Sequence, residues 1–212
     1  MKIKKLLAAA FGVVGLMVST LATASLIGNP VIDRNNADGW ENFVLALTSQ
    51  TFAHSGTVTS WSVWAANSGE LGLLILEDLG SNTYAVKGAN QQTVSAGLNS
   101  FAFTPNSGSA SVQAGWLLGL WIGGAKVDYS SGGQNVAWCS NSGCAGTVPV
   151  AGVGSLTLGD TSFPGSGGGA RTYSVQATYV PEPGSLALFG LGLVGLAMGR
   201  KRWSKRAAPA VA

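Results

Sequence analysis

Apolar and polar side chains alternate along much of the chain between residues 42 and 180. The clearest stretch is 171–180, in which Tyr173, Val175, Ala177 and Tyr179 are separated by single polar residues. A period of two is typical of a β-strand that buries one face. Residues 57–65 follow the same pattern, with Trp61, Val63 and Ala65 on one side and Ser60 and Ser62 on the other, while Trp64 falls on the polar side.

Seven more apolar runs predict strands, and Gly, Asn and Ser separate them. They lie at 42–48, 71–77, 83–87, 98–104, 116–122, 135–138 and 148–158. The runs at 71–76 and 116–122 are apolar on both faces, which predicts central strands that are covered on both sides.

Glu77 and Asp78 open a polar turn through Asn82. We expect an all-β fold, a single antiparallel β-sandwich or jelly roll. The order of these runs is loosely similar to that of jelly-roll modules in secreted bacterial proteins.

The amino-terminal end has a different pattern. Lys2, Lys4 and Lys5 precede an apolar run from Leu6 to Val18, and Ala22, Thr23 and Ala24 are small side chains of the kind that signal peptidase accepts. This arrangement is typical of a secretory signal peptide. We therefore predict export, with cleavage before Ser25.

The carboxyl-terminal end carries three features in a fixed order. Pro181, Glu182 and Pro183 come first, an apolar run from Leu186 to Met198 follows, and Arg200, Lys201 and Arg202 form a basic cluster. The prolines predict an exposed, extended segment. The apolar run is short against the ~20 residues that span a bilayer, so we expect a marginal transmembrane helix. Positive residues favour the cytoplasmic side, which places the preceding domain across the inner membrane.

This arrangement resembles the PEP-CTERM sorting signal of Gram-negative bacteria that produce exopolysaccharide. The resemblance covers about the last thirty residues. It implies that an exosortase, a membrane-embedded processing enzyme, handles the precursor. It further implies an inner-membrane precursor and a mature protein at the cell surface or in the extracellular matrix.

These features divide the chain into a signal peptide at 1–24, a β-sandwich domain at 25–179, a sorting and anchor segment at 180–206 and a short tail at 207–212. The whole chain is basic, with 12 Lys and Arg against 9 Asp and Glu. Residues 25–179 hold four basic and eight acidic side chains, a net charge of −4. Because no basic stripe survives removal of both ends, we expect no nucleic-acid partner.

The cysteines and a group of oxygen ligands are two further candidate sites. Cys139 and Cys144 are the only two cysteines, and in an exported protein a disulfide between them is favoured over free thiols or a zinc site. Asp33, Asn35 and Asp38 lie in the segment richest in oxygen ligands, so they are weak candidates for Ca²⁺. The alternative is an Asx turn. No other cofactor or metal is expected.

No catalytic constellation stands out, and we expect a non-enzymatic protein. His54 is the only histidine, and its neighbours predict an exposed loop residue. A glycoside hydrolase needs two opposed carboxylates, and the spacing of the candidates singles out no pair. These candidates are Glu41, Glu70, Glu77, Asp78 and Asp128.

The tryptophans suggest a sugar partner. An exposed indole ring is a platform on which the C–H groups of a sugar stack. Trp61, Trp116 and Trp121 sit in apolar strands and are expected in the core, whereas Trp64 and Trp138 are the candidates for exposed sugar-binding positions. We therefore expect a structural or adhesive protein of exopolysaccharide or biofilm, with a carbohydrate-binding module and a secreted polysaccharide-active hydrolase as alternatives.

Overall fold

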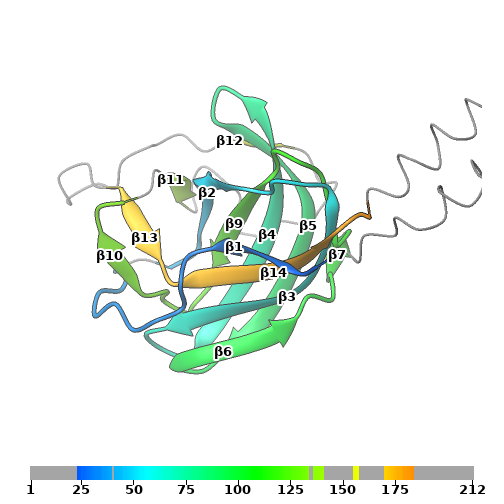
Figure 1. The fold of residues 1–212 in the computed structure, drawn as a ribbon. Coiled ribbons are helices and arrows are strands. Elements are labelled where there is room, and N and C mark those ends of the chain that lie inside the picture. The colour runs from blue at the N-terminus through cyan, green and yellow to red at the C-terminus, as the bar shows by residue number, and fades with distance from the viewer. Residues whose placement is uncertain (1–22, 40, 134–135, 141–154, 158–169, 184–212) are drawn as a thin grey trace, which may run out of the picture. The chain divides into compact units, whose positions relative to one another are not determined.

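The computed structural model describes residues 23–39, 41–133, 136–140, 155–157 and 170–183 (Figure 1). Within these ranges all regular secondary structure is β-strand, and Ala24–Pro181 forms one compact unit. The described residues contain no helix that is long and apolar enough to span a membrane. The predicted signal peptide, the predicted terminal helix and the basic cluster at Arg200, Lys201 and Arg202 lie almost wholly outside the described residues.

The strands of the described residues differ widely in length. In chain order they are β1 (Ser25–Gly28), β2 (Phe43–Thr51), β3 (Gly56–Ala65), β4 (Gly69–Gly80), β5 (Thr83–Val94), β6 (Gly97–Ala102), β7 (Ser107–Gly108), β8 (Ser111–Val112), β9 (Leu117–Ile122), β10 (Tyr129–Ser131), β11 (Val136–Ser140), β12 (Ser155–Thr157), β13 (Arg171–Tyr173) and β14 (Val175–Pro181).

These strands form three antiparallel sheets. The five-stranded sheet has the order β1-β14-β3-β6, with β8 beside β3, and the four strands of this path lie side by side in Figure 1. The seven-stranded sheet has the order β11-β2-β9-β4-β5-β12, with β7 beside β5, and β10 pairs with β13 separately. The chain therefore crosses between the two larger sheets several times. Its last described strand, β14, lies between β1 and β3 in the five-stranded sheet.

The two larger sheets share one hydrophobic core. The five-stranded sheet contributes side chains such as Trp61, Val63 and Tyr179, and the seven-stranded sheet contributes Leu45 and Leu73, all at most 3% exposed. Two sheets that bury their inner faces against each other are the arrangement of a β-sandwich. The predicted all-β antiparallel fold is thus confirmed, while the narrower jelly-roll assignment stays a prediction.

The central strands β4 and β9 are buried on both faces, as their sequences predict. Leu71, Leu73 and Ile75 point into the shared core, whereas Leu74 and Leu76 belong to a second cluster on the opposite face. β9 divides its side chains between the two clusters in the same way. A strand with two buried faces needs apolar side chains at every position, which explains the continuous apolar runs.

One hydrogen bond joins the two sheets through the core. The indole Nε1 of Trp61 on β3 donates to Oδ1 of Asn90 on β5 at 2.7 Å, and Asn90 is fully buried. A buried indole N–H needs an acceptor, so this pair satisfies the one polar atom of the Trp61 side chain.

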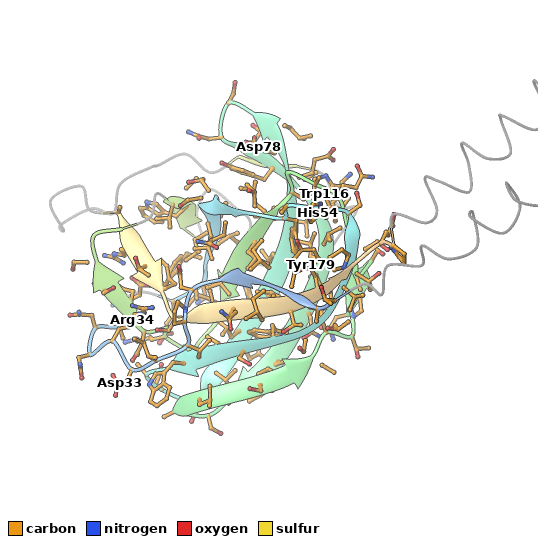
Figure 2. The ribbon with its side chains drawn as sticks, in the orientation of Figure 1. Asp33, Arg34, His54, Asp78, Trp116 and Tyr179 are labelled. Carbon is orange, nitrogen blue, oxygen red and sulfur yellow. The ribbon has the colours of Figure 1, made fainter. Side chains whose placement is uncertain are left out.

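The hairpin between β4 and β5 corrects one expectation. Glu77 and Asp78 lie within β4, which continues to Gly80, and the turn consists of Ser81 and Asn82 (Figure 2 labels Asp78). Both turn residues have positive φ, 53° and 56°, the conformation of the tight hairpin turns that match strand twist. The polar residues before the turn extend the hairpin beyond the core and do not close it.

The predicted strand at 171–180 is divided in two. Arg171–Tyr173 pairs with β10, whereas Val175–Pro181 pairs with β1 and β3. Ser174 lies at the division, where its N–H donates to the carbonyl of Asp128 and its carbonyl accepts from the N–H of Trp64. Alternation continues through the break, so the sequence pattern alone does not reveal it.

Candidate functional site

The residues of the predicted sorting motif begin where β14 ends. Val180 and Pro181 are still in register with Thr57 and Gly56 of β3, and Glu182 and Pro183 follow as exposed residues outside the sheet. Tyr179, just before them, is 3% exposed and packs edge-on against the Phe52 ring at 5.1 Å. Pro181 is the last residue of β14 and is half-buried, which corrects the expectation that the whole Pro-Glu-Pro segment lies exposed outside a sheet. The expected exposure holds for Glu182 and Pro183.

Close backbone approach at this junction requires glycine at position 56. A Cβ atom built on Gly56 would lie 2.3 Å from the carbonyl oxygen of Val180 and 2.8 Å from Cα of Pro181. Both are backbone atoms, which cannot rotate away as a flexible side chain would. Gly56 therefore permits β3 and the end of β14 to stay paired up to the motif.

The outer face of the five-stranded sheet is the second candidate site. Side chains that point away from the shared core alternate with the buried ones along β3, β6, β14 and β1. This outer face consists of Thr57, Ser60, Ser62, Trp64, Leu98, Ser100, Ala102, Gln176, Thr178 and Leu26. None of these side chains is charged, and most carry a hydroxyl or amide group.

Trp64 lies near one end of the outer face and is half-buried. It is in register with Leu98 of β6, which is 60% exposed, and Ser62 lies two positions earlier on the same strand. Ser62 and Ser100 share a hydrogen bond of 2.8 Å between their hydroxyl oxygens. Trp64 thus lies among the polar side chains of its strand, but it is half-buried and not fully exposed, and its role in sugar binding stays a prediction.

Trp138 does not lie at an exposed position, which corrects the prediction. It is 5% exposed, belongs to the shared core and meets the Phe43 ring edge-on at 6.4 Å. β11 pairs with β2 in the seven-stranded sheet, and this pairing turns the indole inward. Its nearness to the cysteine segment therefore gives no indication of exposure, and Trp138 is not available as a sugar platform.

The other tryptophans mostly follow expectation. Trp61 is 1% and Trp121 8% exposed, whereas Trp116 is only partly buried. The ammonium group of Lys87 lies 5.4 Å from the centre of the Trp116 ring, and the same group pairs with Glu77 at 2.7 Å. Because a cation already occupies one side of Trp116, its ring is a poor second platform.

The calcium candidates are not brought together. Asp33 is exposed and accepts the backbone N–H of Asn35 at 3.0 Å, which is the Asx turn of the alternative interpretation. Asp38 is 4% exposed and turns instead toward Arg171 and Tyr173, whose hydroxyl donates to Oδ2 at 2.8 Å. The described residues hold no group of three or more His, Cys, Asp or Glu side chains that could bind a metal.

A polar cluster that the sequence did not reveal fixes this loop to the domain. The guanidinium of Arg171 lies 4.2 Å over the Tyr129 ring and pairs with Asp38. Burial raises the pKa of the Asp38 carboxyl, and the charge of Arg171 offsets part of that rise. Burial and the Asp38 charge raise the pKa of Tyr173 well above its ordinary value. Asp38 in a loop and Arg171 in β13 are far apart in the sequence, and they leave no pattern from which this cluster could be predicted.

Arg34 makes a second set of contacts beside this cluster. Its Nε donates to Ser174 Oγ at 2.7 Å, and its backbone N–H donates to Asp128 at 3.2 Å. Figure 2 shows Asp33 and Arg34 together on the loop that follows β1. Burial is the main cause of a raised pKa at Asp128, and the nearby Asp33 carboxyl adds to the rise, against the lowering effect of the Arg34 N–H.

Several of the remaining candidates make contacts of their own, with no contact between two of them among the described residues. Glu77 pairs with Lys87, Glu70 accepts from the Gln91 amide at 3.3 Å, and Glu41 is exposed in the loop before β2. His54 is exposed in the loop between β2 and β3, as expected (Figure 2). Cys139 lies on β11, but its side chain and all of Cys144 are outside the described residues, so the disulfide stays a prediction.

Comparison with known proteins identifies the carboxyl-terminal motif. Residues 180–202 match the family described as the PEP-CTERM protein-sorting motif. The match begins within β14 and includes Pro181, Glu182 and Pro183 as well as the basic cluster. No curated protein matches the chain. No solved structure matches it either. The motif implies an exported protein with a membrane-anchored precursor that an exosortase processes.

Proposed function

We propose that this exosortase substrate is a non-enzymatic surface or matrix protein that adheres to exopolysaccharide through the outer face of its five-stranded sheet. The observation that carries the proposal is Trp64, an indole ring held on a sheet face among Ser62, Ser100 and Leu98. Sorting brings the domain to the compartment where exopolysaccharide is assembled, and the outer face gives it a means of contact.

The chemistry of the outer face favours a sugar polymer. A half-buried indole is fixed in orientation, so stacking on it costs little side-chain entropy. Hydroxyl and amide groups on neighbouring strands, ~4.8 Å apart, supply hydrogen bonds to sugar hydroxyls beside the ring. An extended face of this kind suits a chain of sugar units better than a single small molecule, which favours a concave pocket.

The absence of charge among the outer-face side chains narrows the class of ligand. Recognition by stacking and neutral hydrogen bonds depends little on ionic strength, whereas recognition of an acidic polymer by basic residues is screened by salt. The domain as a whole is acidic, which disfavours attraction to a strongly anionic polymer. We therefore propose neutral stretches of polysaccharide as the ligand.

The test compares Trp64→Ala with wild type, using mature protein recovered from the host and exopolysaccharide from the same host immobilised on a column. We expect about a tenfold loss of affinity, ~1.4 kcal/mol, for Trp64→Ala. Raising the salt concentration should leave wild-type retention unchanged. The thermal transition should change little, because the ring is only half-buried.

Two matched variants complete the design. Leu79→Ala removes an exposed apolar side chain, 54% exposed, from β4 of the seven-stranded sheet, away from the outer face, and should retain full affinity. Trp138→Ala removes a buried indole and should lower stability by about 3–5 kcal/mol. Equal retention of Trp64→Ala and wild type would exclude the outer face as the binding surface.

A further inference from the structure

The last described strand of the domain is held on both sides almost to its final residue. On one side Gln176–Tyr179 pairs with β1, and on the other Val175–Pro181 pairs with β3. Inward-pointing Val175, Ala177 and Tyr179 are at most 3% exposed. Detaching this strand would expose those side chains and break backbone pairing on two edges, so it is not a segment that frays easily.

The sequence places few residues between the end of β14 and the apolar run. Four residues, Glu182 to Ser185, separate Pro181 from the apolar run that begins at Leu186. Proteins that recognise an extended peptide form hydrogen bonds with its main chain, which must therefore be free of other pairing. The backbone of β14 is already used by β1 and β3, whereas Glu182 and Pro183 are exposed.

The pairing of Pro181 with Gly56 lies at the boundary between these two regions. Pro181 has no N–H to donate, so the terminal pair depends on close packing of the two backbones more than on hydrogen bonding. Gly56 allows that packing, because a Cβ there would meet the Val180 carbonyl at 2.3 Å. Gly56, which lies opposite Pro181, therefore determines how far the paired strands extend toward the sorting motif.

We propose that the β1-β14-β3 sheet sets the upstream limit of the peptide that the processing enzyme can reach, with Gly56 as the positioning residue. Pro181 then remains on the mature protein, and the short free peptide limits the rate of processing. The sorting motif identifies the substrate, and the folded domain determines which peptide bonds are accessible. Neither the sorting motif nor the family match indicates that the folded domain limits which peptide bonds the enzyme reaches.

The first test inserts Gly-Ser-Gly-Ser between Pro181 and Glu182 in the full chain, expressed in a host that has an exosortase. Pulse-chase labelling measures the conversion of precursor, and mass spectrometry identifies the last residue of the mature protein. We expect wild type to end at Pro181 or later. The insertion should at least double the conversion rate and lengthen the mature chain by the inserted residues, because the sheet itself is unchanged.

The second test replaces Gly56 with Ala, and Gly39→Ala is the control because a Cβ there meets no atom within 4 Å. We expect Gly56→Ala to yield mature chains that end before Pro181, while Gly39→Ala ends where wild type does. The identity of the last residue reports positioning, which a loss of stability alone would not shift. If Gly56→Ala fails to fold, the insertion variant of the first test still distinguishes between the two outcomes of the proposal.

Two results would overturn the proposal. One is a folded wild-type domain that ends before Pro181, which would show that paired β14 is open to the enzyme. The other is an insertion variant that is processed at the wild-type rate, which would show that free peptide is not limiting. An unchanged end point in folded Gly56→Ala would remove Gly56 from the positioning role.

Discussion

Ser25 lies directly opposite Tyr179 in the antiparallel pair of β1 and β14. Ser25 is the predicted first residue of the mature chain, and Tyr179 immediately precedes the matched sorting segment. The points where the predicted signal peptide and the sorting segment join the domain are therefore neighbours on one strand pair. Export and sorting act on two chain ends that belong to the same sheet.

β1 should contribute measurably to the stability of the mature domain. Ile27 is 6% exposed in the shared core, so Ile27→Ala should lower the free energy of unfolding by about 2–4 kcal/mol. Leu26→Ala is the matched control on the outer face and should stay within about 0.5 kcal/mol of wild type. Urea unfolding of the mature proteins measures both. Equal stability of the two variants would mean that β1 is not part of the folded domain.

The Pro-Glu-Pro segment should be required for release from the inner membrane. Replacing Pro181, Glu182 and Pro183 with Ala should make the full-length precursor accumulate in the inner-membrane fraction, because the enzyme loses its exposed, extended substrate. Deleting the chain from Glu182 onward should release soluble domain instead. Fractionation followed by immunoblotting distinguishes these outcomes, and normal processing of the triple variant would contradict the assigned motif.

Asp33 should contribute to the raised pKa of Asp128, beside the larger effect of burial. Asp33→Asn removes the neighbouring charge that helps to raise the pKa of Asp128, while the amide oxygen of the new side chain can still accept the Asn35 N–H. A carboxyl whose pKa is raised on folding stabilises the fold at low pH, and this contribution is lost as pH rises through the raised value. The free energy of unfolding of Asp33→Asn, compared with that of wild type, should therefore be more favourable at neutral pH than below pH 3.8, the ordinary Asp value.

Carboxyl NMR titration measures the pKa of Asp128 in this comparison. Asp78→Asn is a suitable control because Asp78 lies in the β4–β5 hairpin, where its carboxylate accepts the Gly80 N–H. A pKa for Asp128 that is the same in wild type and Asp33→Asn would contradict the electrostatic coupling.

Cys139 and Cys144 should form a disulfide in protein purified from the periplasm or medium. Both thiols should resist alkylation until the protein is reduced, after which two alkyl groups should add to the intact mass. Because the closed loop is short, the bond should affect global stability only slightly. Free alkylation without reductant would contradict the prediction.

The sequence predicted the elements of the fold better than their connections. Alternation placed Trp61 inward and Trp64 outward because one face of β3 is core and the other is solvent. The same reasoning could not place Trp138, whose short strand lacks a clear polar face and packs beside Phe43. Contacts between segments that are distant in the sequence, such as Asp38 with Arg171 of β13, depend on topology, which periodicity does not encode.

The intact mass of wild-type protein recovered from the surface or matrix of a host with an exosortase tests the central claim most directly. The claim is that the host removes both ends and leaves the sheet domain. We predict a mature chain that begins at Ser25 and lacks everything after about Pro183. A mass that includes Ala212 would contradict sorting by this motif and leave the terminal segment as a simple membrane anchor.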